Sequence, residues 1–130
     1  MILTNNFFYR YIKLLFFLKI IAGKNNSLII FDQKVNMEFE IFKQSLIEAV
    51  PPAGIAVHLL AMWYEGNGDW NKAHSMVDSL EDTTACWVHA YLHRKEGDIW
   101  NADYWYRKAG RKRPDSSLQQ EWETIVKALL

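Results

Sequence analysis

The chain has 130 residues, half of them hydrophobic, and a formal net charge of zero. This length allows one domain with a hydrophobic core. The mildly acidic body of the chain, residues 37–130, argues against nucleic-acid binding, which needs a basic surface. The single cysteine, Cys86, excludes an internal disulfide and is typical of a reducing compartment, so we expect a cytoplasmic protein.

Residues 1–36 differ in composition from the rest of the chain. They are rich in Phe, Tyr, Ile, Asn and Lys and carry a net charge of +4, whereas residues 37–130 carry −4. Cations such as Arg10 and Lys19 interrupt the apolar stretch, which argues against a membrane span or an ordinary secretory signal. Three interpretations of this N-terminal extension stay open: a start codon assigned upstream of Met37, a degenerate signal or anchor, or a helical extension. Only an anchor would imply contact with a membrane.

Residues 37–130 are predicted to form a single all-α domain. Apolar residues recur there at helical spacing, and no stretch alternates in the way a strand does. The first helix carries an apolar stripe and should end at Pro51-Pro52, because proline lacks the donor that a helix interior needs. The stripe consists of Phe39, Phe42, Leu46 and Val50.

Turn signals divide the remaining chain into five further helices. Gly66-Asn67-Gly68-Asp69 and Gly97-Asp98 break the chain, and a hydroxyl in residues 81–84 is expected to cap the helix that follows. We expect these helices at about residues 54–65, 70–79, 84–95, 100–108 and 116–130.

The last predicted helix is amphipathic. Leu118, Trp122, Ile125 and Leu129 form one apolar stripe, while Glu121, Glu123 and Lys127 are expected to face solvent. This pattern is typical of a helix that caps one end of a domain.

Two segments of the chain repeat at an offset of 29 residues. GNGDWNKAH, from Gly66, parallels KEGDIWNAD, from Lys95, and Ala73 lies at the same offset from Ala102. The offset also aligns a set of positions in the preceding helices: Val57, Leu60, Ala61 and Tyr64 with Cys86, His89, Ala90 and His93. A period of this length indicates stacked supersecondary units.

This pattern resembles the tetratricopeptide repeat. Gly97-Asp98 matches the turn of that family, Ala102 and Ala109 the small contacts, Tyr106 the aromatic residue between them, and Pro114 the end of the repeat. The first unit departs from the pattern, because Leu80 replaces the second alanine and no proline closes it. The resemblance implies antiparallel helical hairpins stacked as a short right-handed array with flanking helices. The string from Trp87 to Arg111 also resembles small uncharacterised bacterial proteins.

The resemblance implies that the first helix of each hairpin lines a concave groove. The groove residues would be His58, Met62, Trp87, Tyr91, Arg94 and Lys95. Trp, Tyr, Met and Arg are enriched at interfaces, and Arg94 and Lys95 would attract a carboxylate. We therefore expect a non-enzymatic module that binds a protein, as a peptide or a helix. Two alternatives stay open: a flanking helix fills the groove, or exposed aromatic residues mediate a homo-oligomer.

A different class of function, a small-ligand or metal-dependent enzyme, would use Cys86, His89 and His93. These residues share one helix face and could hold zinc. However, they align with packing positions of the first unit, and three ligands on one helix make a poor tetrahedral cage. Glu81 and Asp82 would also raise the pKa of the thiol and so oppose a nucleophilic cysteine. The favoured interpretation is packing, with no metal or cofactor.

A basic run ends the second unit: Arg107, Lys108, Arg111, Lys112 and Arg113. Cations at the end of a helix complement its dipole, and this explains most of the run. Arg111 and Arg113 lie beyond the helix and are candidate anion contacts.

Overall fold

The computed structural model describes the backbone of residues 27–130 and the side chains from residue 34 onward. The chain divides into two compact units, Met1–Met37 and Glu38–Leu130. The three interpretations of the N-terminal segment therefore fall largely outside the described residues.

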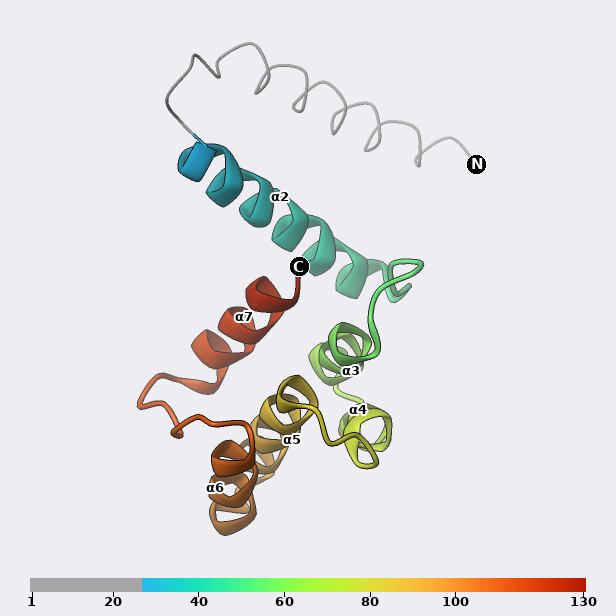
Figure 1. Cartoon of the computed structure of the whole chain (residues 1–130). Helices are drawn as coiled ribbons and strands as arrows, with labels where there is room; N and C mark the ends of the chain where they lie inside the picture. Colours follow the sequence, from blue (N-terminus) through green and yellow to red (C-terminus); the bar gives the residue numbers. More distant parts are fainter. Residues whose placement is uncertain (1–26) are drawn as a thin grey trace. The chain divides into compact units, whose positions relative to one another are not determined.

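The described residues form six helices and no strand, which confirms the all-α prediction. They are α2 (Ser27–Glu48), α3 (Val57–Gly66), α4 (Trp70–Val77), α5 (Thr83–Glu96), α6 (Ile99–Lys108) and α7 (Leu118–Leu129), as labelled in Figure 1. Of these helices, none has the length and apolar character to cross a membrane. Within the first unit, the described part is helical from Ser27 onward.

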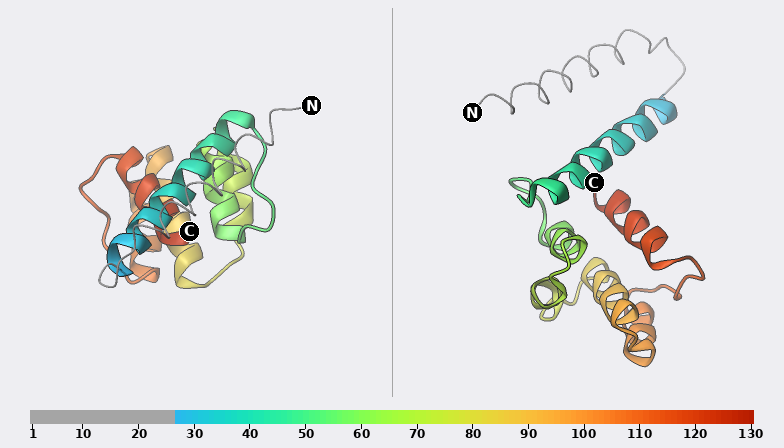
Figure 2. Two further views of the ribbon diagram at one scale, coloured as in Figure 1. Left: turned by 90° about the horizontal axis from the view of Figure 1, so that it is seen from above. Right: turned by 180° about the vertical axis from the view of Figure 1, so that it is seen from behind.

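Within the second unit, consecutive helices pack in pairs. α3 packs chiefly against α4, and α5 against α6. The two pairs are joined through contacts of α5 with α3 and α4, and α7 packs against both α3 and α5 (Figures 1 and 2). α7 therefore lies against the first helix of each pair.

The two Gly-Asp turns have the same geometry in both pairs. Gly68 and Gly97 adopt left-handed φ values of 82° and 90°, a conformation that glycine adopts at low cost. The carboxylate of Asp69 then accepts the Lys72 N–H at 3.0 Å, and that of Asp98 accepts the Asn101 N–H at 3.2 Å. Each aspartate is the N-cap of the following helix.

The predicted offset also holds inside the helices. Ala73 and Ala102 are fully buried, and so are Ala61 and Ala90. Small side chains at these positions allow the paired helices to approach closely. Large buried side chains occupy the next equivalent pair of positions, Val77 and Tyr106.

α2 and α7 close one side of the core. The rings of Phe39 and Phe42 lie 6.2 and 6.0 Å from the Trp122 ring, and the indole N–H of Trp122 donates to the Met62 carbonyl at 3.2 Å. Gly66 lies close to this side of the core, since a Cβ on it would lie 3.0 Å from Trp122 and 3.1 Å from Leu46 and these side chains would have to shift to admit it.

Three local expectations were wrong. Ala49 has a φ of 54° and α2 ends at Glu48, so Val50 is exposed and does not extend the apolar stripe. The cap of α5 is the Asp82 carboxylate, which accepts the N–H groups of Thr84 and Ala85, and not a hydroxyl. Val57, aligned with the packing position of Cys86, is 40% exposed at the start of α3.

Candidate functional site

The apolar residues predicted for the groove lie in the core. Met62, Trp87 and Tyr91 are buried, and α7 covers the helices that carry them. An open groove at these residues is therefore not present, and the alternative that a flanking helix fills it is the one observed. Trp122 of α7 contributes to the packing of α7 against α3, since it is buried and its indole N–H donates to the Met62 carbonyl.

The polar residues predicted for the groove have partners within the chain. Arg94 donates to a carboxylate oxygen of Glu121 and, at 2.5 Å, to the Ser116 carbonyl. Lys95 pairs with the buried carboxylate of Glu65, and burial lowers the pKa of Lys95. The carboxylates that Arg94 and Lys95 were expected to attract thus come from α7 and α3. His58 likewise lies 3.0 Å from Asp82.

Glu121 is buried, contrary to the expectation that it faces solvent. One of its oxygens accepts from Arg94, and the other accepts from the Tyr106 hydroxyl at 2.6 Å. Burial and this hydrogen bond raise the pKa of Tyr106, and burial and the Glu121 charge raise that of Tyr91. Glu121 therefore joins α5, α6 and α7 through one polar contact network.

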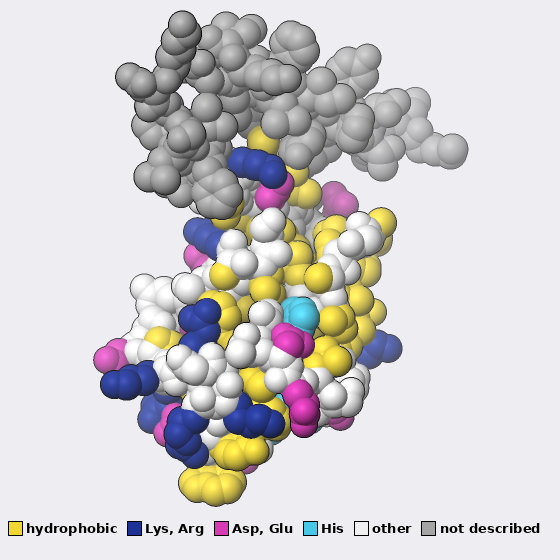
Figure 3. All heavy atoms as spheres, viewed as in Figure 1, with side chains coloured by type: hydrophobic (Ala, Val, Ile, Leu, Met, Phe, Trp, Pro, Cys, Tyr) yellow, Lys and Arg dark blue, Asp and Glu magenta, His cyan; other side chains and the backbone are white. Residues whose placement is uncertain are grey.

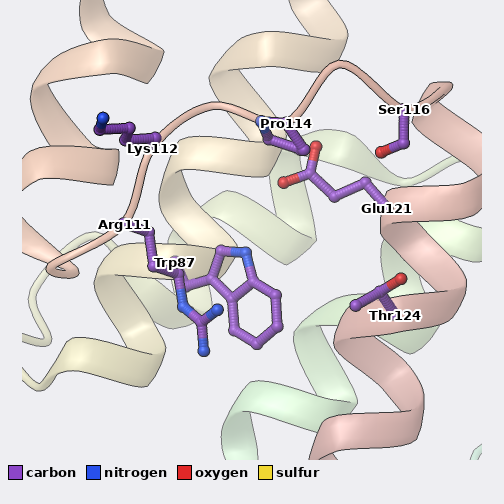
Figure 4. A pocket seen from close by; sticks show the side chains of 7 residues that line it. All are labelled: Trp87, Arg111, Lys112, Pro114, Ser116, Glu121 and Thr124. Carbon is purple, nitrogen blue, oxygen red and sulfur yellow. The ribbon is translucent and has the colours of Figure 1, made fainter.

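A pocket of ≈ 350 Å³ opens beside this network (Figure 4). It is lined by Trp87, Arg111, Lys112, Pro114, Ser116, Glu121 and Thr124. The Arg111 guanidinium lies 3.5 Å from the centroid of the Trp87 ring, a close cation–π contact. In Figure 4 the Lys112 side chain extends away from Glu121. A second pocket, of ≈ 160 Å³, also includes Trp87 and Arg111 and reaches Thr84 and Leu129.

Of the two candidate anion contacts, only Arg111 is unpaired. Arg113 binds Asp103 at 2.8 Å, and this contact raises the pKa of Arg113 and lowers that of Asp103. Among residues 34–130, no carboxylate pairs with Arg111, which is exposed. The sequence predicted Arg111 as a contact but did not predict that it lies on Trp87.

Cys86 lies in the core, apart from the metal-ligand groups. It is buried, its thiol donates to the Glu81 carbonyl at 3.7 Å, and burial raises its pKa. The metal-ligand groups found among the described residues do not include it. The alternative set of Cys86, His89 and His93 is therefore not brought together as one ligand group. A buried thiol with a raised pKa is also a poor nucleophile.

His89 and His93 instead meet a residue that the sequence analysis missed, His74 of α4. The Nε2 atoms of His74 and His89 are 2.8 Å apart, and the rings of His89 and His93 stack at 4.8 Å. Nδ1 of His93 donates to Glu96 at 2.5 Å. The sequence did contain a signal for His74. It directly follows Ala73, and the alignment of Ala73 with Ala102 places Ala73 in the contact between helices.

Aromatic side chains also occupy the outer surface of α6. Trp100 is 79% exposed and Tyr104 is 42% exposed, and the Lys108 ammonium lies 5.8 Å from the Tyr104 ring. Figure 3 shows hydrophobic and basic side chains side by side at the lower end of the molecule, where α6 lies in Figure 1. The sequence analysis linked exposed aromatic residues to self-association, and Trp100 and Tyr104 are two such residues in the structure.

Comparisons of the chain with models of protein families, with curated proteins and with solved structures find no match.

Proposed function

We propose that residues 38–130 form a short tetratricopeptide-like module that binds an acidic segment of another protein and is not an enzyme. The repeated turn geometry of Gly68-Asp69 and Gly97-Asp98 and the buried alanines at equivalent positions support the helical-hairpin assignment. The binding surface in this proposal is not the groove that the family resemblance implies, because α7 fills it.

The observation that carries the proposal is the unpaired Arg111 guanidinium on the Trp87 ring. Arg94, Lys95 and Arg113 each have a carboxylate partner, whereas Arg111 has none among the described residues. Arg111 is exposed and lies in the lining of two pockets, one toward Ser116 and one toward Leu129. An arginine held over an aromatic ring is restricted in position and loses little conformational entropy when it binds a carboxylate.

The surroundings of Arg111 favour a peptide over a small metabolite. The two pockets share Trp87 and Arg111 and are lined by α5, α7 and the segment between α6 and α7. An extended segment can place a carboxylate on Arg111 while its neighbouring side chains occupy both pockets. Lys112 adds a second positive charge to the rim, which increases the association rate with an acidic partner.

The test is peptide binding with charge-reversed variants. We expect an array of acidic peptides to include ligands for the wild-type chain, with binding that weakens as salt is added and is lost when the peptide carboxylates become amides. Arg111→Glu should weaken binding at least about tenfold, since truncating a charged partner in a complex costs about 2–5 kcal/mol. Lys72→Glu is the matched control, because Lys72 is an exposed cation on α4 and lines neither pocket.

Two results would overturn the proposal. One is the absence of any acidic ligand for the folded wild-type chain. The other is an equal loss of binding in Lys72→Glu and Arg111→Glu. That result would show that binding depends on the net charge of the protein and not on a specific site at Arg111. A second variant, Thr124→Tyr, tests the pocket by filling it: Thr124 is exposed and lines the larger pocket, so the change should block peptide binding without unfolding the protein.

A further inference from the structure

Three of the four histidines of the chain converge between α4 and α5. One ring nitrogen from each of His74, His89 and His93 lies within 4.8 Å of one from each of the others. His89 and His93 are four residues apart and project from one face of α5, and His74 faces them from α4. The ligands thus come from two helices. The objection that three ligands on one helix cannot surround a metal ion does not apply to this set.

The distance between His74 and His89 is close to that of two ligands on one bound transition metal. Nitrogen ligands lie about 2.0–2.1 Å from zinc in tetrahedral sites, so two such ligands are roughly 3.4 Å apart. The Nε2 atoms of His74 and His89, at 2.8 Å, would separate by about 0.6 Å to admit the ion. Rotation of the half-buried His74 ring is sufficient for such a change.

Neighbouring side chains already orient the three rings. Trp105 stacks on His89 at 3.9 Å, and Trp70 stacks on His74 at 4.8 Å. His93 donates from Nδ1 to the Glu96 carboxylate. A carboxylate on the second nitrogen of an imidazole is the usual outer partner of a metal-binding histidine, because it fixes the ring and increases its basicity.

The cluster is also incompletely satisfied by hydrogen bonds. Nε2 of His89 faces His74, and Nδ1 of His89 is the one buried side-chain nitrogen or oxygen in the described part of the chain without a hydrogen-bond partner. Apolar packing residues would avoid that cost.

We propose that His74, His89 and His93 bind one divalent transition-metal ion, which links the first helix pair to the second. Imidazole ligands favour zinc, nickel, cobalt or copper over calcium or magnesium. Three histidines leave at least one coordination position for water. His74 is partly exposed and gives the ion a route from solvent. This site is separate from the Trp87–Arg111 surface and does not depend on its function.

The test uses the full chain without an affinity tag, dialysed against a chelator and then titrated. Zinc is added in a calorimeter and cobalt in a spectrophotometer. We expect one ion per chain and the visible absorption of tetrahedral cobalt, displaced by zinc. Glu96→Gln should weaken binding by about 10- to 100-fold, the usual effect of removing the outer carboxylate. His74→Gln should weaken it at least as much.

His58→Gln is the matched control, since His58 pairs with Asp82 and is not part of the cluster. Its affinity for zinc should equal that of the wild type. Unchanged affinity in His74→Gln would overturn the proposal, as would the absence of saturable binding to the wild type. X-ray absorption of the wild-type zinc complex keeps the test independent of variant folding: three imidazole ligands are expected, and fewer than three, or a sulfur ligand, would contradict the site.

Discussion

Arg94 of α5 and Glu121 of α7 form an ion pair in which the carboxylate is buried and the guanidinium is nearly so. Two further hydrogen bonds hold the pair in place, because Tyr106 donates to Glu121 and Arg94 donates to the Ser116 carbonyl. A buried ion pair contributes little to stability compared with apolar residues of the same shape. Removing one partner is nevertheless destabilising, because it leaves an uncompensated buried charge. The pair therefore fixes where α7 docks.

Replacing Glu121 by alanine should destabilise the domain by about 3–5 kcal/mol, because the Arg94 charge would stay buried without its partner. Urea unfolding followed by circular dichroism measures the change. Glu123→Ala is the control: Glu123 lies on the same helix, bonds only to the neighbouring Gln119 in the contacts resolved, and should change stability by less than about 0.5 kcal/mol. Equal effects of the two substitutions would show that the Arg94–Glu121 pair is not formed in solution.

Stability should fall in mild acid because His89 is buried in its neutral form. Its folded pKa, about 3, lies below the ordinary 6.5, so the unfolded chain binds the proton more readily. The contribution of neutral His89 to the free energy of unfolding is complete above pH 6.5 and is lost as the pH falls toward 3. At pH 5 the free energy of unfolding is lower by about 2 kcal/mol because of His89. His74, whose pKa is also lowered, changes stability in the same direction.

Chelator-treated protein provides the measurement, with unfolding free energies compared between pH 7 and pH 5. The variant His89→Gln should lose most of the difference, since glutamine does not titrate. In this window Asp82 and Asp103 contribute little, because their pKa values lie below 3.8 in the folded state. A wild-type protein equally stable at both pH values would contradict the buried, neutral cluster.

Gly66→Ala should be destabilising, although alanine is normally the better helix residue by about 1 kcal/mol. The new Cβ would lie 3.0 Å from the Trp122 ring and 3.1 Å from Leu46, and overpacking of this kind costs about 1–3 kcal/mol. A second substitution, Leu46→Ala, should relieve part of this cost, so the double mutant should be more stable than the sum of the single effects predicts. Additive effects in thermal unfolding would rule out the close contact.

Trp100→Phe should remove most of the collisional quenching of tryptophan fluorescence. Trp100 is 79% exposed, whereas Trp63, Trp87 and Trp122 are buried and the remaining two are half-buried. Stability should change by less than about 0.5 kcal/mol, as for other exposed sites. If acrylamide quenches the wild type and the variant equally, Trp100 is covered in solution. Light scattering over a concentration series would then show whether a second copy covers it.

The repeat was accessible from the sequence because turn chemistry is local. A glycine with positive φ followed by a capping aspartate forms the same structure wherever it occurs, so Gly68-Asp69 and Gly97-Asp98 were assigned correctly. The buried alanines followed from the same offset. Helix type and approximate bounds depend on these local signals and on apolar spacing.

The position of charged side chains could not be obtained in this way. Glu121 was predicted to face solvent because it is a charged residue of an amphipathic helix; its partners, Arg94 and Tyr106, come from two other helices. His74 was missed for the same reason, since only the packing of α4 on α5 brings it to His89. Single-helix patterns carry no information about which polar residues meet across a contact.

The docking of α7 makes that helix an intramolecular ligand. A segment tethered by a short flexible connection has an effective concentration in the millimolar range, so a free helix that competes for Met62, Trp87 and Tyr91 must bind far more tightly than α7 does. Weakening the Arg94–Glu121 pair would lower the affinity that a competing helix needs in order to displace α7. Glu121→Gln should therefore show first as local exposure of Met62 and its neighbours to hydrogen exchange, before any change in global folding.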